Sequence, residues 1–424
     1  MSTRRSTIFG MTCLLLMAFL AGLTTSLVSG QQVLLVPAQY PDIQAAITAS
    51  VSGDTILVSP GIYLGPIDYL GKNILVKGMN GPQVTTIDAA GQQASVVSMI
   101  SGEGPGAVLD GFTVQGGLGT MVGYSFVGSM GGGINVENSS PIIQNCIVQG
   151  NTALTPGLFG SGSSLGGGIR CYTTSGLMPA TPVIRDCVVR NNIGRNGGGI
   201  AIDRSNALIE RCVIEQNESR YGAFGGGGVI VGGVLAGIST IRACSIRYNS
   251  ATGTCGGLRI LTASAMIDNN FICDNYAASH AGLSIETGLS YQTNVTISNC
   301  TISTNDSYHP SALVGGFTIG GSGATTQVTN SIIRGNFPTD VYADPNYPPA
   351  SFTVDHSNIG GGWPGVGNID ADPKFVDPAN LFGGAYRLDS GSPCIDAGTN
   401  GAVTAGAVDF EGDPRIFDRA VDLA

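Results

Sequence analysis

Lysine, histidine and tryptophan are scarce in this chain of 424 residues. It has one tryptophan and three histidines, and its lysines are Lys72, Lys77 and Lys374. Charged residues make up 11% of the sequence, and the net charge is −10. Proteins that bind nucleic acids carry a basic stripe or patch, so this composition excludes nucleic acid as a partner. The negative charge also argues mildly against acidic polymers, although a local basic pocket can override it.

Long apolar runs are missing except near the N-terminus. There, Arg4 and Arg5 precede an apolar stretch at 8–20, and small polar residues follow. This order is typical of an export signal. The alternative is a membrane anchor, but a spanning helix needs about 20 apolar residues and this stretch is shorter. We therefore predict a signal peptide at 1–30, no transmembrane segment after its removal, and a protein that is secreted or at the cell surface.

Glycine, by contrast, is abundant, with 65 residues, many of them in runs. Segments after these runs share the frame I-x-x-C-x-[IV]-x-x-N. The first position of the frame is apolar in every copy: Ile143, Ile184, Ile209, Ile241, Ile267, Ile297 and Val328. The last position is asparagine in every copy: Asn151, Asn192, Asn217, Asn249, Asn275, Asn305 and Asn336. One such unit cannot bury its apolar face alone, so the repeats predict a stacked solenoid.

The local pattern within each repeat is that of β-strands. Ile200–Asp203 and Leu283–Glu286 alternate apolar and polar residues with period two. A turn with asparagine or aspartate separates the second and third of three short strands, because these residues tolerate the left-handed backbone. We predict an all-β fold, a single-stranded right-handed parallel β-helix of about ten coils spaced about 4.8 Å apart. The final asparagines should then form a hydrogen-bonded column along the stack.

The ends of the chain suggest how the solenoid is closed. The stretch 40–50 is helical in pattern, with Ile43, Ala46 and Ile47 on one face. Terminal elements of solenoids must cover the open core, and this helix fits that role. We divide the chain into a signal peptide at 1–30, an N-terminal cap at 31–52, a β-helix at 53–340, and a C-terminal cap or tail region at 341–424.

Several motifs resemble those of known families. "YPDIQAAI" at 40–47, "GDTILVSPGIY" at 53–63 and "AVLDGFTVQGG" at 107–117 resemble exported bacterial pectate-lyase-like β-helix proteins. The alternation of GGGI and [IV]-x-x-N resembles the repeats of polymorphic outer-membrane proteins. "YRLDSGSPCIDAG" at 386–398 and "DFEGDPRIFD" at 409–418 are similar to the C-terminal region of anchor-tailed β-helix proteins. The resemblance implies the β-helix fold strongly, and it implies activity weakly, because such folds carry many functions.

The sequence has ten cysteines, and Cys13 lies in the predicted signal. Four others share one position of the repeat on consecutive coils: Cys146, Cys187, Cys212 and Cys244. Their strand spacing permits disulfides, but in-register side chains point the same way and thiols pack well in a core. We favour buried free thiols over disulfides. The spacing matches no zinc signature.

Candidate site residues lie on the strand that follows each glycine run. We expect its alternate residues on the outside of the coil, where Glu137, Arg170, Tyr172 and Asp203 gather on three consecutive coils. Glu137 and Asp203 would be about 10 Å apart by strand spacing, slightly more than the carboxylates of inverting glycosidases. These four are candidate ligand-binding residues, and Glu137, Arg170 and Asp203 are also candidate catalytic residues. The alternative is a cross-coil ladder in which an arginine lies between two acids.

Two long loops, at 117–130 and 152–165, flank these coils. They carry Tyr124 and Phe159, which we predict to be ligand-binding residues that stack on sugar rings, because binding sites often lie on long loops beside a rigid face. The histidines His280, His309 and His356 are scattered, and we expect them to be solvated.

Carboxylates cluster in "NIDADPKFVDP" at 368–378. Asp370, Asp372 and Asp377 are candidate ligands for Ca²⁺, which prefers oxygen donors. Asp-Pro pairs also start turns, and we favour that interpretation. We therefore expect no cofactor, with Ca²⁺ as the one candidate.

Two functions fit these patterns. The first is an exported non-enzymatic β-helix protein of the cell surface or extracellular space, structural or in contact with a polysaccharide or cell-surface glycan. The second is a polysaccharide lyase or another carbohydrate-active enzyme that works on the GGGI-strand face, with Arg170 as a base if strongly desolvated. The motifs of β-helix polygalacturonases and alginate epimerases are missing, which favours the first.

Overall fold

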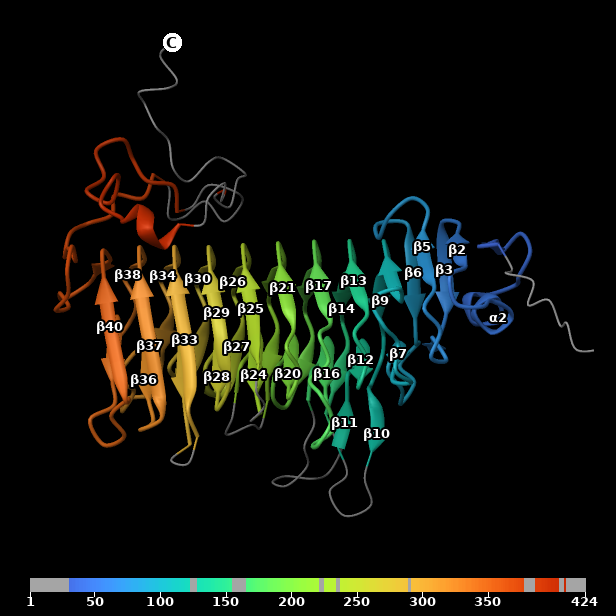
Figure 1. Ribbon diagram of the computed structural model, residues 1–424, viewed down its shortest axis with the longest axis horizontal. Helices are drawn as coiled ribbons and strands as arrows, with labels where there is room; N and C mark the ends of the chain where they lie inside the picture. Colours follow the sequence, from blue (N-terminus) through green and yellow to red (C-terminus); the bar gives the residue numbers. More distant parts are fainter. Residues whose placement is uncertain are drawn as a thin grey trace, which may run out of the picture. The chain divides into compact units, whose positions relative to one another are not determined.

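The computed structural model describes residues 30–122, 128–154, 165–220, 225–233, 237–288, 291–376, 386–403 and 408. The fold lies within the unit Val33–Ala424. Nearly all of its strands are parallel and stack in register, which makes the chain a right-handed parallel β-helix, as the repeats predict. Figure 1 shows these strands side by side in sequence order, from β2 to β40.

Four parallel sheets run along the stack of described residues, and we name them A to D. Sheet A has twelve strands: β1 (Val33–Val36), β2 (Thr55–Val58), β5 (Leu75–Gly78), β8 (Val108–Asp110), β13 (Ile142–Gln144), β17 (Val183–Arg185), β21 (Leu208–Glu210), β25 (Ile238–Arg242), β29 (Ser264–Asp268), β33 (Thr293–Ser298), β37 (Ala324–Thr329) and β40 (Ser351–Asp355). Sheet B has eleven: β3 (Gly61–Leu64), β6 (Thr85–Asp88), β9 (Thr113–Gln115), β14 (Ile147–Gln149), β18 (Val188–Arg190), β22 (Val213–Glu215), β26 (Ser245–Arg247), β30 (Phe271–Cys273), β34 (Thr301–Ser303), β38 (Ile332–Arg334) and β41 (Asn358–Ile359).

Sheets C and D complete each coil. Sheet C has ten described strands: β4 (Ile67–Asp68), β7 (Val97–Met99), β12 (Ile134–Glu137), β16 (Ile169–Tyr172), β20 (Ile200–Asp203), β24 (Val229–Gly232), β28 (Leu258–Leu261), β32 (Leu283–Glu286), β36 (Phe317–Gly320) and β39 (Val341–Ala343). Sheet D has six: β15 (Thr152–Ala153), β19 (Ile193–Gly194), β23 (Glu218–Ser219), β27 (Ser250–Thr254), β31 (Tyr276–Ser279) and β35 (Asp306–Ser307). An antiparallel hairpin, β10 (Thr120–Val122) and β11 (Gly128–Met130), projects from one coil.

A coil passes through the sheets in the order C, A, B, D. The sequence predicts three strands per repeat, and these are the strands of sheets C, A and B. The strands of sheet D were not predicted, because several of them are only two residues long and show no alternating pattern. From the run at 166–168 onward, the glycine runs lie between a strand of sheet D and the next strand of sheet C.

The core is a set of columns in which equivalent side chains lie on top of each other. The first residues of the repeat frame are paired from coil to coil, from Ile143 through Ile184 to Ile209 and onward, and all are buried. The first and third residues of the sheet C strands from β7 to β36 are buried in the same way. Burial of these stacked branched chains supplies the main stabilisation of the coils.

The repeat asparagines form the predicted column. Each side-chain Nδ2 donates to Oδ1 of the next asparagine at 2.8 to 3.1 Å, from Asn151 to Asn336 without a break. Each Nδ2 also donates to a backbone carbonyl oxygen of sheet B. The column therefore satisfies buried polar groups at the corner where sheet B ends.

The corner between sheets A and B has a left-handed residue in each repeat. The predicted residues adopt positive φ there: Asn145, Asp186, Asn269, Asn299 and Asn330. Arg211 and Ala243 occupy the same position, with φ of 50° and 52°. This conformation is unfavourable by about 1–2 kcal/mol for a residue with a Cβ, and by less for asparagine.

We expect Ala243→Asn to raise the free energy of unfolding by about 0.5–1 kcal/mol, because asparagine tolerates the left-handed backbone that alanine resists. Chemical denaturation of the variant beside the parent protein measures this change. A lower stability would show that the new side chain collides with its neighbours on the adjoining coils.

The cysteines in the described residues are free thiols, nine in number. Cys146, Cys187, Cys212 and Cys244 are buried in one column, and each sulfur lies near a backbone carbonyl oxygen of the preceding coil, as for Cys187 and Ile143 at 3.7 Å. Burial raises the pKa of the Cys171 thiol, on sheet C, to about 12. Such thiols are unreactive core residues.

The N-terminal end of the stack is covered by the helix α2 (Ile43–Ala49). Its buried residues are the three predicted ones, Ile43, Ala46 and Ile47, and it packs against β1, β2 and β4. Asp42 caps it by accepting a hydrogen bond from the Ala45 backbone at 2.7 Å. Strand β1, which pairs with β2, precedes this helix and was not predicted.

The C-terminal segment folds back over the stack. A 3₁₀ turn, η1 (Asn400–Ala402), is held where Asn330 exchanges two hydrogen bonds with Thr399. Two more hydrogen bonds join this segment to earlier coils of the stack. The Tyr386 hydroxyl donates to Asp274, and Asn269 donates to the carbonyl oxygen of Val408. No helix in the described residues is long and apolar enough to cross a membrane.

Candidate functional site

The outer face of sheet C carries two columns of side chains in the register that the repeats predict. The second residues of its strands form the inner column, which lies nearer to sheet D: Asn135, Arg170, Ala201, Ile230, Arg259, Ser284 and Thr318. The fourth residues form the outer column: Glu137, Tyr172, Asp203, Gly232, Leu261, Glu286 and Gly320. The face therefore presents one pair of positions per coil.

The inner column is buried, although the sequence led us to expect both columns on the surface. Asn135 is 3% exposed, Arg170 5% and Arg259 2%. The glycine runs explain this, because each run turns sharply and passes directly over the column. A Cβ added to Gly166 would lie 2.9 Å from the Cβ of Arg170. Gly166 also has a φ of +68°, which favours glycine.

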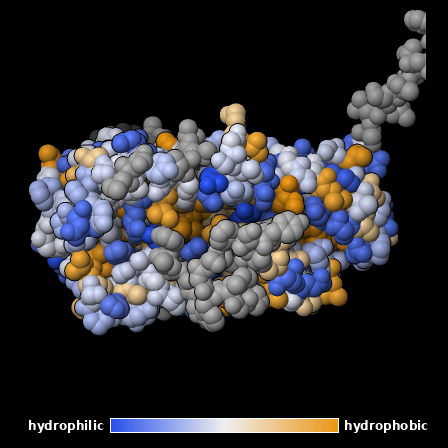
Figure 2. All heavy atoms as spheres, turned by 90° about the horizontal axis from the view of Figure 1, so that it is seen from below, coloured by the Kyte–Doolittle hydropathy of each residue, from blue (hydrophilic) through white to orange (hydrophobic). Residues whose placement is uncertain are grey.

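The surface seen from below in Figure 2 is hollowed near its middle, where hydrophobic residues lie beside strongly hydrophilic ones. In Figure 1 the labels of β12, β16, β20, β24 and β28 lie toward this side.

Arg170 is the centre of the predicted cluster. Its Nη1 donates to Asn135 Oδ1 at 2.9 Å and to Glu137 Oε2 at 3.2 Å, so three of the residues on two coils are joined. Its guanidinium also lies over the ring of Tyr172, with 4.5 Å between Cζ and the ring centroid. The Nε of Arg170 is buried and has no hydrogen-bond partner among the described residues.

Asp203 lies one coil beyond Tyr172. Burial raises the pKa of its carboxyl above the usual value, and Arg204 and Arg170 oppose this shift. Arg204 Nη1 lies 3.4 Å from the Tyr172 hydroxyl. The structure thus brings Glu137, Arg170, Tyr172 and Asp203 together on three coils, and it places an arginine at each side of the tyrosine.

A second cluster, which sequence analysis missed, lies farther along the same face. Arg259 donates through Nη2 to Glu286 Oε2 at 2.6 Å and through Nη1 to Thr254 Oγ1 at 2.6 Å. Ser284 donates to the other oxygen of Glu286 at 2.8 Å. His280, expected to be solvated, has a buried Nδ1, and burial lowers the pKa of its imidazole. The sequence could have predicted this cluster, because Arg259 lies in the same column as Arg170 and Glu286 in the same column as Glu137.

These two ion pairs differ from the cross-coil pairs of sheets A and B. There the base is the more exposed partner: the side chain of Arg242 is 52% exposed against 6% for Glu210, and Arg247 is 22% exposed against 18% for Glu215. On sheet C the order is reversed, with Arg170 at 6% against 33% for Glu137. Arg259 shows 2% against 32% for Glu286. A row of cross-coil ion pairs at the surface does not require buried guanidinium groups, and such groups are costly to desolvate.

The remaining candidates lie apart from this face or outside the described residues. Tyr124, Phe159 and Asp377 are among the residues that the structure does not describe. Asp370 forms an ion pair with Arg334, and Asp372 accepts a hydrogen bond from the Lys374 backbone at 2.9 Å, as in a turn. Within the described residues, no group of three or more His, Cys, Asp or Glu could hold a metal ion. The expectation of no cofactor, with Ca²⁺ as the one candidate, stays a prediction.

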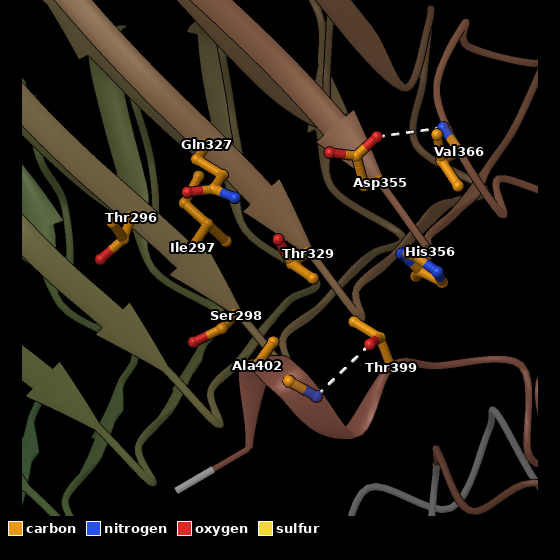
Figure 3. A pocket seen from close by; sticks show the side chains of 11 residues that line it. Thr296, Ile297, Ser298, Gln327, Thr329, Asp355, His356, Val366, Thr399 and Ala402 are labelled. Carbon is orange, nitrogen blue, oxygen red and sulfur yellow. Dashed lines mark hydrogen bonds between the residues drawn. The ribbon is translucent and has the colours of Figure 1, made fainter.

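A separate cleft of about 580 Å³ lies between sheet A and the C-terminal segment. Figure 3 shows Thr296, Gln327 and Thr329 on the strands opposite Thr399 and Ala402. Its polar groups partly serve the fold, since Asp355 accepts a hydrogen bond from the Val366 backbone at 3.0 Å. This cleft marks where the C-terminal segment is attached, and the candidate site remains the face of sheet C.

A family model agrees with this class of fold. Residues 167–358 match a family model described as a right handed beta helix region, and no curated protein matches the sequence. The chain is similar to the A-module of the mannuronan C-5 epimerase AlgE6 of Azotobacter vinelandii, with 15% identity over 78% of this chain and 95% of that chain, and a TM-score of 0.36. It is also similar to pectin methylesterase from carrot, with 10% identity over 84% of this chain and 92% of that chain, and a TM-score of 0.32.

Proposed function

We propose that this protein is an exported β-helix that binds a glycan chain along the outer face of sheet C without cleaving it. The observation that carries this proposal is the buried guanidinium of Arg170, which lies between Glu137 and the Tyr172 ring. A fixed, desolvated group of this kind is pre-organised for hydrogen bonds to a ligand. An aromatic ring with charged groups around it provides both stacking and polar contacts.

The arrangement favours binding over proton abstraction. A lyase that used Arg170 as its base would need the neutral guanidine, but Glu137 and Asn135 both accept hydrogen bonds from this side chain. Those acceptors stabilise the cation. Glu137 in turn is held by Arg170, so we assign it to ligand contact and not to acid or base chemistry.

Export and surface location complete the proposal. The N-terminal pattern of Arg4, Arg5 and an apolar stretch supports secretion. The GGGI repeats resemble polymorphic outer-membrane proteins, and the segments at 386–398 and 409–418 resemble those of anchor-tailed β-helix proteins, which supports a bacterial protein at the cell surface or outside the cell.

We expect Arg170→Met to weaken glycan binding at least tenfold, about 1.4 kcal/mol, because the variant keeps the apolar stem and loses the hydrogen-bond donors. Arg247→Met is the matched control, since Arg247 also pairs with a glutamate on the adjoining coil, Glu215, but lies on sheet B and is more exposed than Arg170. Calorimetric titration against a panel of polysaccharides measures both variants. Equal binding by the parent protein and Arg170→Met would contradict the proposed site.

The same panel tests the absence of cleavage. Incubation with each polysaccharide should release neither new reducing ends nor unsaturated sugars, which absorb in the far ultraviolet. Either product, formed by the parent protein and lost in Arg170→Met, would show that the face is an active site of a carbohydrate-active enzyme.

A further inference from the structure

The two ion pairs of sheet C mirror each other along the stack. Glu137 lies one coil before Arg170, and Glu286 lies one coil after Arg259. Between the two arginines, Ala201 and Ile230 occupy the inner column on consecutive coils. Along the stack, the face therefore presents in order an acid, an arginine, two apolar residues, a second arginine and a second acid. Since the coils repeat, the second arginine offers a ligand the same group as the first.

Two buried polar atoms near Arg259 lack partners among the described residues. Thr318, two coils beyond Arg259 in the inner column, is 3% exposed, and its hydroxyl makes no hydrogen bond. His280 Nδ1, at the turn that leads into β32, is also unbonded. A buried polar atom without a partner destabilises the fold, and a ligand that supplies the partner removes this penalty. Thr85 on sheet B and Thr326 on sheet A also have buried hydroxyls without a partner among the described residues, but they lie on the core side of their strands, whereas Thr318 lies in the inner column of the outer face.

We propose that Arg259, Ser284, Glu286 and Thr318 form a second subsite for the same glycan chain, and that this glycan is uncharged. The inference rests on the proposed binding function of sheet C and extends it to the class of ligand and its length. Arg259 lies three coils after Arg170, so the two positions are about 14 Å apart at the strand spacing. A chain that touches both subsites must therefore contain several sugar rings.

The charges on the face favour a neutral ligand. Each arginine in the inner column is already matched by a glutamate within 3.2 Å. Asp203 is beside Arg204, and Asp344 lies near His280. A ligand carboxylate would meet Glu137 or Glu286 at each arginine, and the net charge of −10 would oppose its approach. Hydroxyl groups accept from arginine and donate to glutamate at once, so an uncharged sugar satisfies both members of each pair.

The test uses Thr318→Val, which removes the unbonded hydroxyl and keeps the shape of the side chain. The parent protein and the variant are titrated calorimetrically with soluble neutral polysaccharides and with polygalacturonate and alginate, and then with short and long oligosaccharides of whichever polymer binds. Thr325→Val is the control, because Thr325 is an exposed strand residue of sheet A. Thermal unfolding is followed for all three proteins.

We expect Thr318→Val to weaken binding of a long neutral oligosaccharide about fivefold or more, while its melting temperature is unchanged or higher. A short oligosaccharide that fills only the Arg170 subsite should bind the parent and the variant equally. Binding restricted to polygalacturonate or alginate would overturn the neutral ligand, and equal binding of long chains by parent and variant would overturn the second subsite; both results leave the proposed function in place. Failure of every glycan to bind the parent protein would remove the proposed function itself.

Discussion

Replacing Asn217 with alanine is expected to lower the free energy of unfolding by about 3–5 kcal/mol, because several buried polar groups lose their partners together. Asn217 lies in the middle of the asparagine column and is fully buried. Its Nδ2 donates to Asn249 Oδ1 at 3.0 Å and to the Val189 carbonyl oxygen at 2.8 Å. Its Oδ1 accepts from both the backbone N–H and the side chain of Asn192.

Chemical denaturation followed by circular dichroism measures this loss. Asn294→Ala is the matched control, since Asn294 is an exposed residue of β33, and surface substitutions usually change stability by less than about 0.5 kcal/mol. If both variants lose the same small amount of stability, the asparagine column stabilises the fold no more than an exposed polar residue does. Water that enters the vacated space and replaces the lost bonds would also reduce the effect.

A comparable loss, about 3 kcal/mol or more, is expected for Gly199→Ala, because overpacking against backbone cannot be relieved by a rotamer change. A Cβ at this position would lie 2.6 Å from the carbonyl oxygen of Gly228 on the next coil and 3.0 Å from Asn217 Nδ2. The methyl group would therefore push two coils apart and disturb the asparagine column at the same point. Thermal unfolding and the yield of folded protein measure the effect.

Gly232→Ala separates this steric effect from the general cost of losing a glycine. Gly232 is the last residue of β24 in sheet C, and a Cβ there meets nothing closer than the Leu261 carbonyl oxygen at 3.7 Å. We expect its stability to stay within about 0.5 kcal/mol of the parent. Similar losses in both variants would mean that glycine is needed at these strands for a reason other than the approach of the next coil.

The sequence predicts the fold well because the repeat fixes which residues share a column. Once Ile143 and Ile184 are aligned, every other position follows, and the alignment correctly pairs Arg170 with Ala201 and Tyr172 with Asp203. The left-handed corners at Asn145 and Asp186 follow from residue type alone. Local preference and stacking agree here, which is why a single sequence suffices.

The environment of the candidate site could not be predicted in the same way. Alternation says that Arg170 points away from the core, but it does not say that the next glycine run turns over it. That burial depends on the path between sheets D and C, where strands such as Thr152–Ala153 are too short to leave a periodic signal. The pairing of Arg259 with Glu286 could be found from the columns, but the nearby Thr254 and His280 could not, because they lie along that path.

The attachment of the C-terminal segment affects the order in which the molecule can be completed. Asn269 contacts Val408, 139 positions later, and Tyr386 contacts Asp274, 112 positions earlier. The coils themselves need only their neighbours, so each can form as soon as the adjoining coil is present. The side of the stack at Asn269 and Asp274, however, stays uncovered until Tyr386 and Val408 reach it. The final step of assembly is therefore a long-range one in a molecule otherwise built from adjacent parts.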